Sequence, residues 1–176
     1  MATLIPLAMA FNRSRLLALA VLATLGCRGP APDLAAYPFT AAQRQAVART
    51  LRAHPGWRLA TRADNTAPDL ATVLKEQPDY EPYFARATNR PAAHADFALA
   101  LVRDGNFAVY WFRATDGGYA PGQEVTVAGW LHDGGLRFRG DELEVAPFHS
   151  DEIFAFRWPP HAARPALVPP DSDSGP

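Results

Sequence analysis

The chain has 176 residues, of which 48% are hydrophobic and 20% are charged, and its formal net charge is −1 at pH 7. This length predicts one domain of ordinary size, and the composition is typical of a globular protein rather than a disordered one. Because acidic and basic residues nearly balance, nucleic acid is not an expected partner.

The first 26 residues have the three-part pattern of a secretory signal peptide. Arg13 and Arg15 form a basic region, residues 16–25 form an apolar run, and Gly26 follows the run. As a helix this run spans about 17 Å, which is too short for a bilayer core of about 30 Å. Residues 1–26 are therefore predicted to be a signal peptide and not a membrane span.

Thr24, Leu25, Gly26 and Cys27 resemble the lipobox of bacterial lipoproteins, although the family usually has Leu where this chain has Thr24. In that family the cysteine thiol receives a diacylglyceryl group and becomes the new N-terminus. Cys27 is the only cysteine of the chain, so no internal disulfide is available to it. The resemblance implies an anchor to the lipid bilayer through acylated Cys27. Arg28, in place of the Asp that retains many lipoproteins in the inner membrane, favours the outer membrane, facing the periplasm.

The rest of the chain divides into three parts. Proline and glycine in residues 28–38 disfavour regular structure, so residues 27–38 are predicted to be a lipidated tether. Residues 159–176 contain six prolines and are predicted to be a disordered tail. The globular domain is expected over residues 39–158.

The first predicted element of this domain is a helix that begins at Thr40. Thr40 and Gln43 have the spacing of a capping box, in which each side chain binds a free backbone N–H. Gln43 and Val47 share one helix face. Pro55 and Gly56 end the helix.

A second helix is predicted over residues 67–76, with Thr66 as its N-cap and Pro78 beyond its end. Short strands are predicted where apolar residues alternate with polar ones. These strands cover residues 57–62, 83–87, 143–146 and 153–158.

A β-hairpin is predicted over residues 95–113, because Asp104 and Gly105 form a strong hairpin-turn signal between two alternating segments. A type I′ turn there places Arg103 opposite Asn106. One face then carries Phe97, Leu99, Leu101, Ala108, Tyr110 and Phe112, and the other carries Ala98, Ala100, Val102, Phe107, Val109 and Trp111. Since both faces are apolar, the hairpin is expected to be central and covered on both sides.

A second hairpin is predicted over residues 124–140 around the dipeptide Asp133-Gly134. The same turn type pairs Leu131 with Leu136 and Gly129 with Phe138. Trp130 then lies opposite Arg137 on the other face, within reach of a cation–π contact. Trp and Arg are enriched at interface hot spots, so Trp130 and Arg137 are predicted to face a partner.

These elements together predict an α+β fold. Two N-terminal helices are expected to pack on a mainly antiparallel sheet of about five to seven strands.

The histidines and acidic residues do not form a recognisable metal site. His94, His132 and His149 each stand near an aspartate, but none has the spacing of a zinc site. We therefore expect no metal and no cofactor, and the three histidines are assigned to turns.

Catalytic motifs are also absent. Ser150, His149 and Asp151 are neighbours in sequence and cannot converge as a triad requires, and there is no G-x-S-x-G motif. Asp141, Glu142 and Glu144 are candidates for paired carboxylates. They are assigned instead to a solvated turn and an edge strand.

The region of residues 88–112 resembles small secreted bacterial proteins of unknown function. In those proteins an acidic loop of the type D-x-N-G-D-G precedes a strand similar to Asp96-Phe-Ala-Leu-Ala-Leu-Val102. Here Thr88, Arg90 and Ala92 occupy the loop positions. Since calcium needs six to eight oxygen ligands, the resemblance implies the strand but not the ion site.

Two classes of function remain open. The first is a non-enzymatic envelope lipoprotein that presents its domain to another protein or to a cell-wall polymer. The second is a small-ligand-binding or hydrolytic periplasmic domain whose residues converge only in the fold. A flat exposed aromatic patch favours the first, and a deep apolar pocket with converging polar groups favours the second.

Overall fold

The computed structural model describes residues 33–91 and 94–169. The signal peptide, Cys27 and part of the tether lie outside the described residues, as does the end of the predicted tail. Among the described helices, none is long and apolar enough to cross a membrane.

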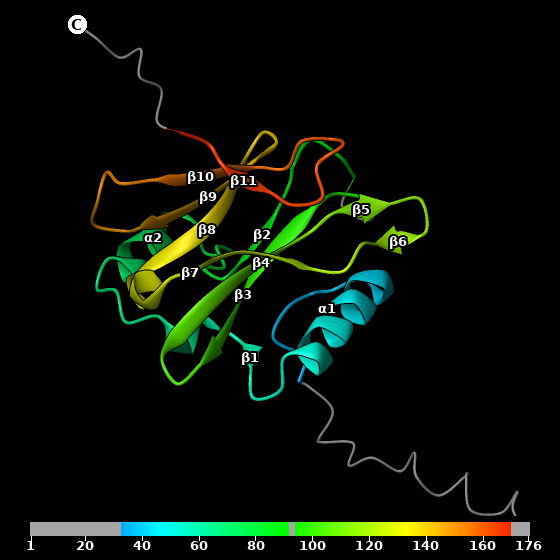
Figure 1. Ribbon diagram of the computed structural model, residues 1–176. Coiled ribbons are helices and arrows are strands. Elements are labelled where there is room, and N and C mark those ends of the chain that lie inside the picture. Colours follow the sequence, from blue (N-terminus) through cyan, green and yellow to red (C-terminus); the bar gives the residue numbers. More distant parts are fainter. Residues whose placement is uncertain (1–32, 92–93, 170–176) are drawn as a thin grey trace, which may run out of the picture. The chain divides into compact units, whose positions relative to one another are not determined.

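The described part of the chain is mostly β-structure, with eleven strands in three antiparallel sheets and two α-helices (Figure 1). The helices are α1 (Ala41–Ala53) and α2 (Leu70–Glu76), and there are 3₁₀ turns η3 (Arg62–Asp64) and η4 (Gly129–Asp133). The strands are β1 (Arg58–Leu59), β2 (Phe84–Arg86), β3 (Phe97–Arg103), β4 (Asn106–Phe112), β5 (Ala114–Thr115), β6 (Gly118–Tyr119), β7 (Gln123–Val127), β8 (Gly134–Arg139), β9 (Glu142–Pro147), β10 (Phe154–Arg157) and β11 (Ala166–Leu167).

The predicted α+β fold, with two N-terminal helices on one sheet of five to seven strands, is therefore wrong. Strands β1, β5, β6 and β11 have only two residues each, too few for an alternating pattern to be recognised. Helix α2 begins at Leu70, later than predicted, and has no side-chain N-cap bond. Leu70 is its only buried residue, so α2 does not form a packing layer.

The hairpin of β3 and β4 lies at the centre of the fold, and its predicted register is confirmed. Arg103 pairs with Asn106 and Phe97 pairs with Phe112. Asp104 and Gly105 have φ angles of 51° and 77°, as a type I′ turn requires. The sheet order β1-β3-β4-β7, with β2 also paired to β3, gives each of the two hairpin strands partners along both edges.

One face of this sheet is covered by the N-terminal part of the domain. The capping box of Thr40 and Gln43 is present, and α1 ends as predicted before Pro55. Helix residues Ala46, Val47 and Leu51 share one buried cluster with the sheet residues Phe97, Leu99, Leu101, Tyr110 and Phe112. The fully buried Gln43 donates from Nε2 to the Tyr119 hydroxyl at 3.3 Å, so this polar side chain is not left unpaired.

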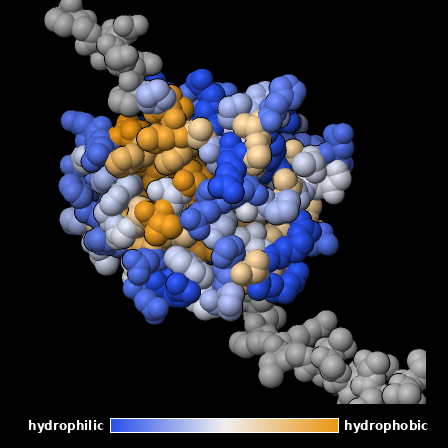
Figure 2. All heavy atoms as spheres, viewed as in Figure 1, coloured by the Kyte–Doolittle hydropathy of each residue, from blue (hydrophilic) through white to orange (hydrophobic). Residues whose placement is uncertain are grey.

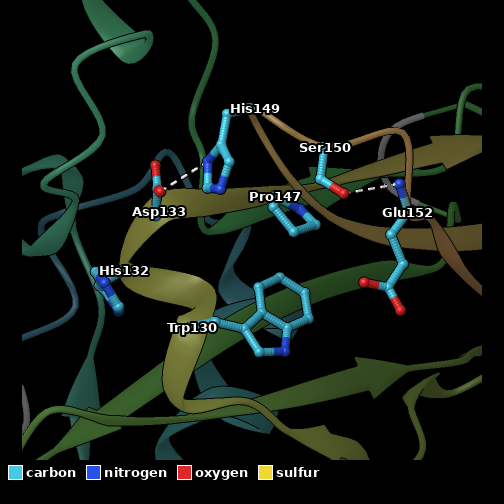
Figure 3. A pocket seen from close by; sticks show the side chains of 7 residues that line it. All are labelled: Trp130, His132, Asp133, Pro147, His149, Ser150 and Glu152. Carbon is cyan, nitrogen blue, oxygen red and sulfur yellow. Dashed lines mark hydrogen bonds and ion pairs between the residues drawn. The ribbon is translucent and has the colours of Figure 1, made fainter.

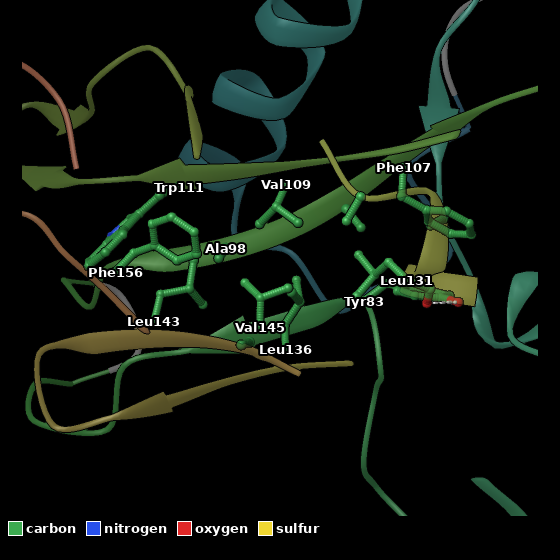
Figure 4. Packing of buried hydrophobic residues seen from close by; sticks show 14 of the residues in the cluster. Tyr83, Ala98, Phe107, Val109, Trp111, Leu131, Leu136, Leu143, Val145 and Phe156 are labelled. Carbon is green, nitrogen blue, oxygen red and sulfur yellow. Dashed lines mark hydrogen bonds between the residues drawn. The ribbon is translucent and has the colours of Figure 1, made fainter. Parts of the chain in front are cut away.

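The opposite face of the sheet packs on the second sheet, whose order is β11-β10-β9-β8 (Figure 4). Apolar side chains from both sheets fill the space between them; the buried ones include Val109, Trp111, Leu136, Leu143, Val145 and Phe156. The Trp111 ring meets Phe138 and Trp158 edge-on, with centroids 5.2 and 5.8 Å away. The Leu136 amide donates to the Pro82 carbonyl at 2.8 Å and connects the two sheets along one side.

The predicted hairpin over residues 124–140 is wrong. Gly129–Asp133 is the 3₁₀ turn η4, β7 pairs with β4, and β8 pairs with β9. Gly134 has a φ of −155°, so it is extended and not the left-handed residue of a turn. Leu136 accordingly pairs with Val145, and Phe138 pairs with Leu143.

The folded region extends beyond residues 39–158 at both ends. Tyr37, expected in the tether, is buried and donates from its hydroxyl to the Ala60 carbonyl at 2.6 Å. Residues 166–167, expected in the tail, form β11 and pair with β10. Both segments are short, and neither has a periodic pattern that a sequence argument can detect.

Candidate functional site

A cleft of about 400 Å³ lies where η4 meets the loop between β9 and β10 (Figure 3). Its lining residues come from these two segments and from the end of β9: Trp130, His132, Asp133, Pro147, His149, Ser150 and Glu152. The cleft is therefore built where two chain segments meet, on one rim of the second sheet.

Trp130 provides the aromatic surface of the cleft. Its ring stacks on Phe154 of β10, with centroids 5.6 Å apart and an angle of 27° between the planes. Phe154 covers one face of the indole but does not itself line the cleft. Figure 3 shows the indole between His132 and Glu152, with Pro147 and His149 above it.

His149 and Asp133 form an ion pair when the imidazole is protonated. His149 Nδ1 lies 2.8 Å from Asp133 Oδ2, and the histidine side chain is exposed to solvent. His132 Nδ1 lies 2.8 Å from the Gly129 carbonyl oxygen within its own turn. The pairing of Asp133 with His149 fixes the loop after β9 against η4.

The arrangement contains an oriented base but no activated nucleophile. Ser150 Oγ accepts the Glu152 amide at 3.0 Å, and no hydrogen bond joins Ser150 to His149 among the described residues. The partner of His149 is Asp133, and not the neighbouring Asp151 that the sequence offers. An Asp–His pair that is not hydrogen-bonded to a hydroxyl or thiol orients a proton acceptor but does not complete a triad.

The electrostatic character of the cleft is acidic. Asp133 and Glu152 are among its lining residues, and none of those residues is Lys or Arg. Within the described residues, no three His, Cys, Asp or Glu side chains converge in a way that would hold a metal ion. Hydrogen-bond acceptors and one aromatic ring are thus the features that the cleft offers to a ligand.

The two residues predicted to face a partner lie in different surroundings. Arg137, on β8, forms an ion pair with Glu144, which lies directly opposite it on β9. The Arg137 side chain is 60% exposed, whereas that of Glu144 is 5% exposed. The predicted cation–π contact of Trp130 with Arg137 is wrong, because the ring stacks on Phe154 and the guanidinium binds a carboxylate.

The acidic residues of β9 are held by arginines. Glu142 accepts a hydrogen bond from Arg157 of β10, and Asp141 lies 3.8 Å from the same guanidinium. Glu142 and Glu144 thus form cross-strand ion pairs, and Asp141 lies in the turn before β9.

A second cleft of about 390 Å³ lies beside the aromatic cluster of Trp111, Phe138 and Trp158. Two of its polar lining residues, Arg113 and Asp96, already have partners. The Arg113 guanidinium lies 4.3 Å from the Trp158 ring centroid and donates to backbone carbonyls, among them that of Pro159. Asp96 accepts from Trp111 Nε1 at 3.1 Å and from the Ala114 amide at 2.9 Å. These groups stabilise the fold, and burial lowers the pKa of Arg113.

The loop before Asp96, where no calcium site is expected, contributes Asn89 and Arg90 to the lining of this second cleft. Ala92 and Ala93 lie outside the described residues. His94 is exposed, and its backbone amide closes a turn onto the Pro91 carbonyl at 2.8 Å.

Sequence reasoning missed Pro147, Glu152 and Phe154, and it missed the pairing of Asp133 with His149. These residues meet only because β8 and β9 bring the two ends of a hairpin together. No local sequence pattern marks such a pair.

Comparison of the chain with protein-family models, with curated proteins and with solved structures finds no match.

Proposed function

We propose that this chain is a membrane-anchored envelope lipoprotein whose folded domain binds an envelope protein or a cell-wall polymer and carries out no catalysis. The anchor is a diacylglyceryl group on Cys27, and the location is the outer membrane, facing the periplasm. The proposal for the anchor is supported by the basic, apolar and Gly26-Cys27 pattern of the first 27 residues.

The observation that carries the binding role is the cleft at Trp130. It presents an aromatic surface beside carboxylates on exposed loops, and within the described residues neither of its histidines, His132 and His149, is hydrogen-bonded to a side-chain hydroxyl. Aromatic side chains at such a position supply contact area at low entropic cost. Function is argued from this site because a fold alone does not imply a function.

The anchor is tested by metabolic labelling. Cells that express the full chain in the presence of labelled palmitate should incorporate the label, and Cys27→Ser should abolish it. Ser150→Ala is the matched control, because this exposed residue is far from Cys27 in sequence and should leave the label unchanged. Equal labelling of Cys27→Ser and the wild-type chain would overturn the proposed anchor.

The alternative, a hydrolytic periplasmic domain, has one observation in its favour. Asp133 holds His149 as a catalytic base is held in a triad. In an assay with activated esters and oligosaccharides, turnover that disappears in His149→Ala and Asp133→Asn would favour this alternative. Absence of turnover in the wild-type chain would favour the binding role.

A further inference from the structure

We propose that the cleft at Trp130 binds a neutral saccharide, with the Trp130 ring stacking against one sugar and Asp133, His149 and Glu152 hydrogen-bonding its hydroxyl groups. This inference rests on the proposed binding function and names its ligand class.

The stacking surface is the first reason. A pyranose ring has faces made of C–H bonds, and such faces contact the negative face of an aromatic ring favourably. Trp130 lines the cleft, and Phe154 stacks against one face of its indole. A ring backed in this way keeps its orientation when the ligand is absent, which lowers the entropic cost of binding.

The polar groups around the ring are the second reason. Sugar hydroxyls act as donors and acceptors along the edge of a pyranose, so a site for them needs acceptors beside the stacking surface. Asp133 and Glu152 offer carboxylate oxygens, and His149 has its second ring nitrogen left for a ligand, because Nδ1 is engaged by Asp133. Figure 3 shows Glu152 beside the indole and the Asp133–His149 pair above it.

Charge decides between neutral and anionic ligands. A phosphate or carboxylate ligand needs Arg, Lys or a cluster of backbone amides, and no Arg or Lys lines this cleft. Glu152, which makes no ion pair among the described residues, would repel such a ligand. A neutral sugar has no charge to be repelled, and its hydroxyls can donate to the carboxylates of Asp133 and Glu152.

The test uses the full chain, purified in a detergent without a sugar headgroup. The probe is the tetramer of N-acetylglucosamine, and binding is measured by isothermal titration calorimetry. The wild-type chain should bind it, and Trp130→Ala should weaken binding about tenfold or more, the loss expected when about 1.4 kcal/mol of contact is removed. Trp130→Phe should keep part of the affinity, because the phenyl ring preserves a smaller stacking surface.

Two further variants separate a loss of the site from a loss of the fold. Trp57→Ala removes a half-buried tryptophan that lies under Arg103 and outside the cleft, so it should bind the tetramer like the wild type. Glu152→Gln changes an exposed loop side chain that makes no ion pair among the described residues, so it should fold normally and bind more weakly. Glucose 6-phosphate should bind more weakly than glucose to the wild-type chain.

Three outcomes would overturn the inference: no binding of the tetramer, equal binding by the wild type and Trp130→Ala, or binding of a short neutral peptide in place of the sugar. None of them affects the palmitate label on Cys27. Loss of sugar binding with an intact label therefore rejects the saccharide alone, and loss of the label with intact sugar binding rejects the anchor alone.

Discussion

Replacing Gly134 with alanine is expected to destabilise the domain, and the reason is steric. The added Cβ would lie 2.5 Å from the carbonyl oxygen of Ala146 and 3.2 Å from Cα of Pro147, both of them backbone atoms of β9. Since Gly134 is extended, with a φ of −155°, alanine adopts this conformation without strain, and the contact alone sets the cost. Overpacking of this kind costs about 1–3 kcal/mol, offset by about 0.4–1 kcal/mol from the reduced entropy of the unfolded chain.

The net loss of about 1–2 kcal/mol should lower Tm by roughly 2–8 °C in a thermal unfolding experiment. Gly129→Ala is the matched control, because no atom lies within 4 Å of its added Cβ. It should leave Tm unchanged or raise it slightly. A hairpin around Asp133-Gly134 would instead place Gly129 under the Phe138 ring. Destabilisation by Gly129→Ala, or none by Gly134→Ala, would refute the strand register described above.

Leu99→Ala should cost about 2–5 kcal/mol of unfolding free energy in a denaturant titration, because Leu99 is fully buried. Leu167→Ala is the control and should cost much less, because Leu167 is 55% exposed. Equal losses in the two variants would contradict this assignment of the core. The hydrogen bond from Arg58 is the main reason that the pKa of Asp64 lies below its usual 3.8. Ionised Asp64 therefore stabilises the folded state above pH 3.8, and this stabilisation is lost as the pH falls through the folded-state pKa. Asp64→Asn should therefore unfold at a lower temperature than the wild type at pH 7, with a gap that narrows below about pH 4; a gap that stays constant would argue against the ion pair. Burial raises the pKa of Tyr110 to about 12 from 10.0, so its neutral form stabilises the domain below pH 10 and this contribution is lost as pH rises toward 12. In a pH titration followed by phenolate absorbance, the difference between the wild type and Tyr110→Phe should appear near pH 12. A difference that appears near pH 10 would contradict the burial of Tyr110.

The elements that the sequence predicts well are those fixed by local chemistry. The β3–β4 hairpin follows from a turn dipeptide between two alternating strands, and the start of α1 follows from the capping box at Thr40. The dipeptide Asp133-Gly134 carries the same turn signal but forms no hairpin. Its backbone is bound elsewhere: the Thr66 amide donates to the His132 carbonyl, and the Phe148 amide donates to the Asp133 carbonyl. These long-range bonds override the local preference.

The candidate site was predictable only in part, for the same reason. Trp130 stands out by residue type, since tryptophan is enriched at interface hot spots. Its stacking partner Phe154 is separated from it by β8 and β9, and the same two strands bring His149 to Asp133. Which distant residues meet depends on the strand register, and this register was predicted wrongly for β8.

The two sheets are joined along one side by the hydrogen bond from Leu136 to Pro82, whereas no backbone hydrogen bond within the described residues joins β7 to β10 or β11. Amide protons in β3 and β4 should therefore exchange with solvent only on global unfolding, and those of β10 and β11 should exchange through smaller local openings. One wall of the cleft adjoins this less protected part, because Glu152 is in the loop that leads into β10. A ligand that bridges Trp130 and Glu152 would hold η4 to that loop. Ligand binding should therefore slow amide hydrogen exchange in β10 and leave exchange in β3 unchanged.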